Sequence, residues 1–168
     1  MLRELHTELG IPASYGLDTG LPLFLEPGEL VDVGPNLVGR MQRLTAEAAR
    51  QWQAMNAAAV ADGIELLIVS GYRSIEYQAA LIRNKLEAGQ AIDEILTANT
   101  APGFSEHHTG QAVDIATPGS RPLTEEFESS AAFGWLGRRA HEFGFSMSYP
   151  RDNPWGITFE PWHWSIKG

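Results

Sequence analysis

The chain has 168 residues, of which 43% are hydrophobic and five are tryptophan, and this is enough for one domain with a sizeable core. Its formal net charge of −9 argues against nucleic acid as a partner, because that affinity comes mainly from Lys and Arg neutralising phosphates. The lack of cysteine excludes disulfides, thiolate catalysis and sulfur-ligated zinc, so any metal site has to be built from His, Asp and Glu.

The start of the chain, MLRELHTELG, contains neither a basic leader nor an apolar signal core. No window approaches the roughly 18 consecutive apolar residues that a membrane span needs. We therefore expect a soluble chain without a membrane span. Two locations stay open: the cytoplasm if the chain is complete as given, and the bacterial periplasm or cell wall if a leader was removed.

A single domain over residues 1–168 is predicted, with a Gly/Pro-rich lead-in at 1–36 and a core at 37–168. The lead-in is expected to form turns and short extended pieces. Asn36 is predicted to cap a long helix that Asp62 and Gly63 end. The apolar residues of this helix recur at steps of three and four: Leu37, Met41, Leu44, Ala48, Trp52, Met55 and Ala59.

Residues 64–105 are predicted to form a strand, a helix and a surface segment. The run IELLIV at 64–69 predicts a strand buried on both faces. Ser74 is a plausible cap for a second helix that ends at Gly89, and 90–105 is expected to return across the surface.

The last third of the chain predicts a helix over 129–143 and strands over 145–149 and 159–166, with a loop over 149–158 between them. Strands separated by helices, with hairpin-like final segments, favour an α+β domain over a parallel doubly wound one. The expected architecture is a small antiparallel sheet flanked by helices.

The stretch GFSEHHTGQAVDIA, residues 103 to 116, contains the first candidate ligands. In a strand, Val113 and Ile115 point to one face and Asp114 points to the other. A buried carboxylate needs a cation, strong hydrogen bonds or water. A turn at Thr109 and Gly110 can fold His107 back beside Asp114, so the two side chains can share one metal.

The C-terminal block EPWHW offers the rest of such a site. An ideal strand would send Glu160 and His163 to opposite faces, but Pro161 cannot continue a central ladder, which lets Glu160 turn toward His163. His107, Asp114 and His163 are the set of three protein ligands that leaves the fourth position of a catalytic zinc open to water. Glu160, uncoordinated, would then act as the general base in metal-assisted amide hydrolysis.

Arg73 precedes the second helix, where its guanidinium and the positive helix end can converge on an anion. It can bind a substrate carboxylate or stabilise the oxyanion, and the sequence leaves both uses open. Gln78, one helical turn further on, can present its amide to the same cleft.

The blocks SGYRS, SEHHTGQAVDI and EPWHW together resemble the signature blocks of the zinc D-alanyl-D-alanine carboxypeptidases (VanY-like), which share a fold with the hedgehog signalling domain. By position, the resemblance implies Zn²⁺ as cofactor, His107, Asp114 and His163 as its ligands, and Glu160 as the base. It also implies that Arg73, with Gln78 and Ser105, lines the substrate pocket.

The resemblance implies removal of the terminal D-alanine from a D-Ala-D-Ala end, with the peptidoglycan stem peptide or its precursor as partner. An L,D-carboxypeptidase and a peptidoglycan endopeptidase are the alternatives within hydrolases. A non-catalytic zinc-holding wall-binding module is the alternative from another class, but it would need neither Glu160 nor Arg73. Packing is the simplest interpretation of Trp162, and stacking on substrate at the rim is the other.

Overall fold

A four-stranded antiparallel sheet lies at the centre of the structure, a computed structural model that describes residues 1–167. Its strands, in spatial order, are β3 (Leu67–Ser70), β4 (Ala112–Ala116), β6 (His163–Ile166) and β5 (Phe145–Met147). All three pairings are antiparallel, and β4 and β6 are the central strands. The predicted α+β class with a small antiparallel sheet is confirmed.

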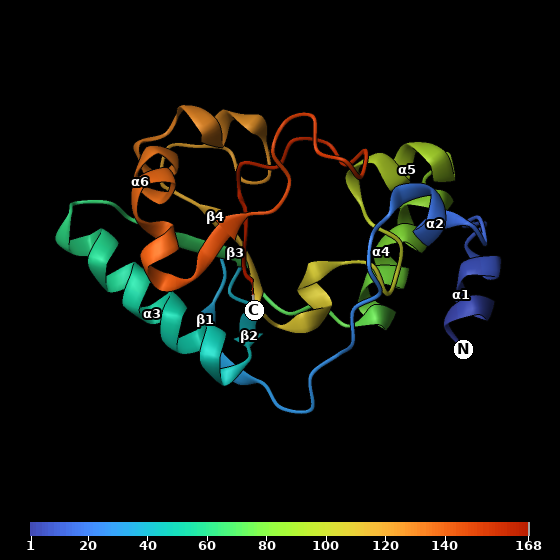
Figure 1. Cartoon of the computed structure of the whole chain (residues 1–168), viewed down its shortest axis with the longest axis horizontal. Coiled ribbons are helices and arrows are strands. Elements are labelled where there is room, and N and C mark those ends of the chain that lie inside the picture. Colours follow the sequence, from blue (N-terminus) through green and yellow to red (C-terminus); the bar gives the residue numbers. More distant parts are fainter. Residues whose placement is uncertain (168) are drawn as a thin grey trace.

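Helices cover both sides of this sheet (Figure 1). They are α1 (Leu2–Glu8), α2 (Tyr15–Thr19), α3 (Ala46–Ala61), α4 (Ile75–Glu87), α5 (Ile92–Ala98) and α6 (Ala131–Arg139), with short 3₁₀ helices η1 (Glu106–Thr109), η2 (Glu125–Ser129) and η3 (Ala140–Phe143). In Figure 1, α3 and α6 lie on one side, while α1, α2, α4 and α5 lie on the other. Among residues 1–167, no helix combines the length and the apolar character that a membrane crossing requires.

The main hydrophobic core lies between the sheet and the helices α3 and α6. Val113 and Ile115 of β4 are fully buried there against Trp52 and Met55 of α3 and Leu136 of α6. The alternation of β4 therefore directs its apolar residues to this core, as the sequence predicts, and directs Asp114 to the opposite face.

A second hydrophobic cluster joins the helices on the other side of the sheet. Ile82 of α4 and Ile95 of α5 are buried in it with Tyr15, Phe104 and Tyr149. Polar side chains from α4 and from the sheet line a small cavity where the two halves meet. The fold thus leaves the polar face of β4 and β6 opposite α4.

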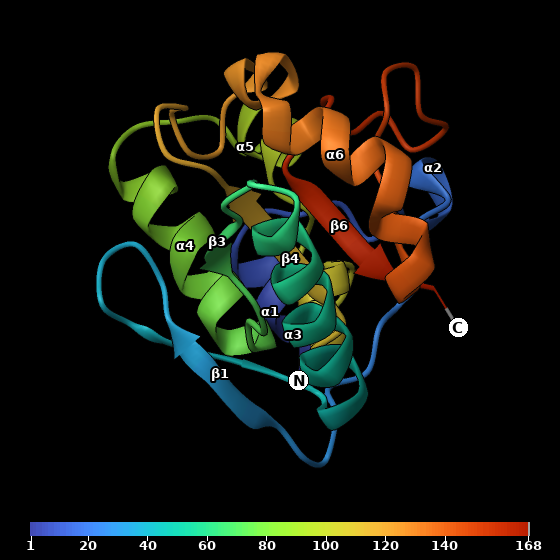
Figure 2. The ribbon, with the colours of Figure 1, turned by 90° about the vertical axis from the view of Figure 1, so that its left-hand side faces the viewer.

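The predicted helix over 37–59 is wrong at its N-terminal end. Residues 31–44 form an antiparallel hairpin of β1 (Val31–Pro35) and β2 (Met41–Leu44), and α3 begins only at Ala46 (Figure 2 labels β1 and α3). The side chain of Asn36 accepts hydrogen bonds from the backbone N–H of Val38 and Arg40, so it closes the hairpin turn instead of capping a helix. Thr45 caps α3 by accepting from the N–H of Ala48.

Other boundaries follow the sequence more closely. Helix α4 begins after its predicted cap Ser74, and α6 with η3 fills the range predicted for the third helix. The strands are shorter than predicted at 64–69, 145–149 and 159–166. Two expectations were wrong: 90–105 contains α5, and the lead-in contains α1 and α2 as well as turns.

Candidate active site

The pairing of β4 with β6 places the first two candidate ligands side by side. Asp114 is the register partner of His163 on β6, and on its other flank it pairs with Ser70 of β3. The side chains of Asp114 and His163 are almost fully buried. After β3 the chain continues through Gly71 to Arg73, so the connection from β3 to α4 also reaches this point.

His107 arrives from η1, which begins after Ser105. The Ser105 hydroxyl accepts a hydrogen bond from the His107 N–H at 3.3 Å and so caps this turn. Gly110 ends η1 with φ of 67°, and a Cβ there would lie 2.9 Å from Leu30 Cδ2. The reversal at Gly110 returns the chain into β4 and brings His107 beside Asp114, as the sequence predicts.

Three ligand atoms converge at this point. His107 Nε2 and His163 Nδ1 each lie 3.1 Å from Asp114 Oδ1, and all three atoms lie within 4.8 Å of one another. Ligand atoms held tetrahedrally by zinc at bonds of about 2.0 to 2.1 Å are themselves about 3.3 Å apart. The spacing of these three side chains therefore fits one ion between them.

The ring hydrogen bonds of the two histidines fit the same interpretation. His107 donates from Nδ1 to the Gly71 carbonyl at 2.7 Å, which leaves its Nε2 with a lone pair, and this buried atom has no hydrogen-bond partner in the described chain. His163 donates from Nε2 to Glu106 Oε2 at 2.9 Å, which turns its Nδ1 to Asp114. Outer hydrogen bonds of this kind orient imidazoles toward a metal.

Glu106 is a buried carboxylate that the sequence interpretation missed. Besides His163, it accepts from the Ser148 hydroxyl at 2.5 Å and the Lys167 ammonium at 2.6 Å. Burial works to raise the pKa of Glu106, but these three donors outweigh it and hold the pKa well below the usual range. The sole signal in the sequence was a glutamate next to the predicted ligand His107.

Burial and neighbouring charges shift the pKa values of the two candidate histidine ligands in opposite directions. Burial lowers the pKa of His107 to about 4, and Arg73 contributes in the same direction. Burial also works against charge on His163, but hydrogen bonds to Asp114 and Glu106 dominate and raise its pKa to about 10. In the absence of a metal, His163 thus holds a proton between two carboxylates, at a position where a divalent cation can replace it.

Glu160 lies beside the three candidate ligands at a longer distance, with Oε2 3.9 Å from His163 Nδ1. The irregular backbone expected at Pro161 is present, because β6 begins only at His163 and the His163 N–H bonds the Glu160 carbonyl. Burial is the main cause that raises the pKa of Glu160 to about 7. A carboxylate with this pKa is suited to accept a proton near neutral pH.

Next to Glu160 lies a small cavity of about 40 Å³. Its lining includes the predicted residues Arg73, Gln78 and Ser105, together with Tyr149, which no sequence pattern singles out. Gln78 donates to the Thr100 carbonyl at 2.8 Å, and its buried Oε1 has no partner in the described chain. The cavity therefore offers both a cationic donor and an amide acceptor.

The Arg73 side chain is 20% exposed and lies between this cavity and Asp114. Its Nη2 is 4.0 Å from Asp114 Oδ2, and its buried Nε has no hydrogen-bond partner among the described residues. His108 fixes the backbone here by donating from Nδ1 to the Arg73 carbonyl at 2.7 Å. Arg73 thus keeps donors available for an anion.

Trp162 is not brought to this cavity. It lies partly buried against the main core. It is the last residue before β6, which begins at His163.

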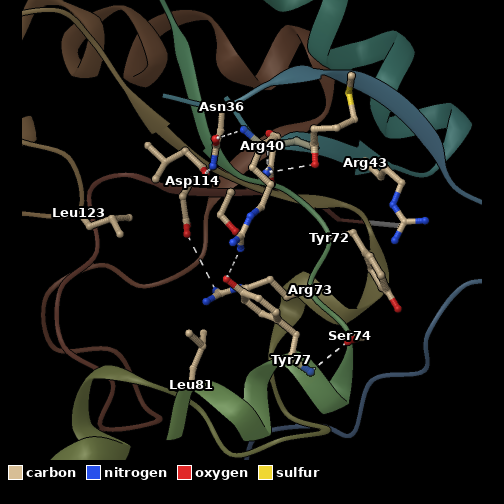
Figure 3. A pocket seen from close by; sticks show the side chains of 14 residues that line it. Asn36, Arg40, Arg43, Tyr72, Arg73, Ser74, Tyr77, Leu81, Asp114 and Leu123 are labelled. Carbon is tan, nitrogen blue, oxygen red and sulfur yellow. Dashed lines mark hydrogen bonds and ion pairs between the residues drawn. The ribbon is translucent and has the colours of Figure 1, made fainter. Parts of the chain in front are cut away.

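A larger groove of about 490 Å³ begins at Asp114 and Arg73 and runs between the β1–β2 hairpin and α4 (Figure 3). Arg40 from the hairpin and Tyr77 from α4 enter it from opposite sides. The sequence did not reveal this groove, because the hairpin was predicted to be part of a helix.

Comparison with known proteins identifies relatives of this chain. A model of the VanY family, described as D-alanyl-D-alanine carboxypeptidase, matches residues 41–168. The Bacillus subtilis protein YodJ, named as a carboxypeptidase, is 36% identical over 156 residues, which cover 88% of this chain and 56% of that protein. The chain spans about half the length of the curated relatives it matches.

Two solved structures are similar in fold. The structure of the LdcB LD-carboxypeptidase, which was determined to explain how that enzyme recognises peptidoglycan, has a TM-score of 0.76 and 34% sequence identity to this chain. The match covers 88% of this chain and 72% of the LdcB chain. A VanY D,D-pentapeptidase variant from a VanB-type vancomycin-resistance cassette, in complex with Zn(II), has a TM-score of 0.65 and 27% identity, covering 90% and 89%. The fold expected from the three sequence blocks is confirmed, and His107, Asp114 and His163 are positioned for a metal.

Proposed function

We propose, because this chain belongs to the VanY family of D-alanyl-D-alanine carboxypeptidases, that it is a zinc carboxypeptidase that removes the terminal D-alanine from peptidoglycan stem peptides. The observation that carries this proposal is the spacing of His107, Asp114 and His163 around one point, with Glu160 uncoordinated beside them.

Zinc held by His107, Asp114 and His163 would supply Lewis acidity for the water and the substrate carbonyl. The chain supplies the proton transfers. Glu160 takes the proton from the attacking water and passes it to the leaving amine as the C–N bond breaks. Arg73 carries a positive charge to the same place, where it binds the substrate carboxylate or the developing oxyanion.

The small cavity next to Glu160 supports an exopeptidase. Its volume of about 40 Å³ leaves no room for a continuing peptide chain, and Arg73 and Ser105 offer donors for a free carboxylate. An endopeptidase would need room for a continuing chain on this side.

An L,D-carboxypeptidase is the second candidate, and the similarity to the LdcB LD-carboxypeptidase favours it. The two activities differ in the configuration of the residue before the scissile bond, while the terminal D-alanine is common to both. The same zinc ligands, base and small cavity serve either reaction.

The test is a mass-spectrometric digest of synthetic stem pentapeptide and tetrapeptide by the zinc-loaded protein. Loss of one alanine from the pentapeptide alone establishes a D,D-carboxypeptidase, and loss from the tetrapeptide establishes L,D specificity. A C-terminally amidated pentapeptide is the control, because an enzyme that binds a free terminal carboxylate should leave it intact. An internal cut would indicate an endopeptidase.

Glu160→Ala separates catalysis from metal binding. We expect activity to fall by about 10²- to 10⁴-fold, the usual contribution of a general base, while zinc stays bound. Activity that persists would overturn the assignment of the base. No cleavage by the wild-type protein with zinc bound would favour a non-catalytic wall-binding module.

A further inference from the structure

The groove between the β1–β2 hairpin and α4 has an unusual charge for a protein with a net charge of −9. Its lining includes three arginines, Arg40, Arg43 and Arg73. Asp114, a candidate zinc ligand, is the only acid among the described lining residues. Clefts lined by one sign of charge concentrate ligands of the opposite sign, so this groove favours an anion.

The backbone of Arg40 is fixed at the mouth of this groove. Asn36 accepts from the Arg40 N–H at 3.0 Å, and its own N–H donates to the Arg40 carbonyl at 2.8 Å. Gln42 also donates to the Arg40 carbonyl, and its Oε1 accepts from the Gly71 N–H at 2.9 Å. These contacts tie the hairpin turn to the connection that leads to Arg73.

The side chain of Arg40 is oriented as well. Its Nη1 donates to the Tyr77 hydroxyl at 2.8 Å across the groove, as Figure 3 shows. This bond uses one of the five guanidinium N–H groups, and the hydroxyl proton of Tyr77 stays available. A cation and a hydroxyl donor held in this way lose little conformational entropy when they bind a carboxylate.

The position of the groove relative to the zinc ligands decides which part of a substrate it receives. Asp114 lines the groove, whereas Glu160 and His163 line the small cavity on the other side of Arg73. A peptide with its terminal residue in the small cavity and its scissile carbonyl at the three ligands would continue into the groove toward its amino end.

We propose that this groove binds the part of the substrate on the amino side of the scissile bond, and that Arg40 with Tyr77 selects a free side-chain carboxylate there over its carboxamide. This inference rests on the proposed peptidase function. It makes Arg40 a specificity residue that lies apart from the proton transfers at Glu160.

The test uses two synthetic peptides that end in D-Ala-D-Ala. They differ only in the residue that precedes these two alanines, whose side chain ends in a carboxylate in one peptide and in a carboxamide in the other. We expect the wild-type protein to have a KM about tenfold lower for the acid, with similar kcat, and high salt to reduce the difference. Arg40→Gln should remove the preference. Arg138→Gln is the matched control, because Arg138 is an exposed arginine on α6 and its loss changes the net charge equally.

Binding of the same peptides by calorimetry completes the experiment. Cleavage without an acid preference, or an unchanged preference in Arg40→Gln, overturns the inference and leaves the proposed function intact. Acid-selective binding that depends on Arg40, without cleavage, supports the groove and overturns the proposed function. Absence of both cleavage and binding overturns both.

Discussion

Zinc binding should be strongly pH-dependent, because the ion has to displace a proton from His163. In the metal-free protein, Asp114 and Glu106 raise the pKa of His163 to about 10, whereas zinc needs the neutral imidazole with its Nδ1 lone pair free. Below that pKa, each unit of pH should change the apparent affinity by about tenfold. At about pH 7, three units below it, the proton therefore weakens zinc binding by about 10³-fold.

The assay is a competition titration against a chelator of known affinity between about pH 7 and about pH 9, with calorimetry in buffers of different ionisation enthalpy to count released protons. Deprotonation of zinc-bound water would add to the slope, so a variant is needed to isolate His163. Glu106→Gln keeps an acceptor for His163 Nε2 and removes its charge, and should make the affinity less dependent on pH. An affinity independent of pH in the wild-type protein, with no proton released, would refute this reasoning.

Three further outcomes are expected. Activity should be lost as pH falls through the pKa of Glu160, because only the carboxylate accepts a proton. Burial raises that pKa to about 7, and bound zinc should lower it. A pH profile of kcat/KM without an acid limb above the ordinary value of 4.5 would contradict the role of Glu160 as the base. Removal of zinc should lower the melting temperature, because the candidate ligands of the ion lie on η1, β4 and β6. Zinc at 100 times its Kd adds about 2.7 kcal/mol to the free energy of unfolding. Scanning calorimetry with and without chelator checks this, and an unchanged melting temperature would argue against a shared site. Thr45→Ala should lower the free energy of unfolding by about 1 kcal/mol, because it removes the cap of α3. Denaturant unfolding measures this effect, with Thr7→Ala on α1 as the control. Equal stabilities of the two variants would contradict the capping role of Thr45.

The candidate zinc ligands could be predicted because each follows from a local rule. Alternation along β4 separates Asp114 from Val113 and Ile115, and the turn at Gly110 returns His107 to it. Only the pairing with His163 required a contact between distant segments. The ligand count and the family pattern both indicated it, and the register of β4 and β6 shows it.

The supporting residues could not be predicted because their roles depend on tertiary contacts. Glu106 reaches Ser148 and Lys167, which lie 42 and 61 residues away along the chain. Tyr149 enters the small cavity from the loop after β5. No periodicity or spacing in the sequence connects such residues.

The missed hairpin has a more specific cause. Leu37, Met41 and Leu44 continue the helical spacing of α3, so the pattern alone does not mark the boundary at Thr45. In the hairpin only Leu44 of these three is fully buried. Leu44 is buried from the hairpin and not from α3, so apolar spacing continues past the start of the helix.

This error also concealed the groove and with it the proposed specificity residue. A helix over 37–59 would have placed Arg40 on an exposed helical face without a reason to approach Arg73. The hairpin instead fastens Arg40 to β3 through Asn36 and to the β3–α4 connection through Gln42. The proposed reaction centre is therefore built from the three blocks that the sequence displays, while the proposed selectivity depends on a turn whose hydrogen bonds only the fold reveals.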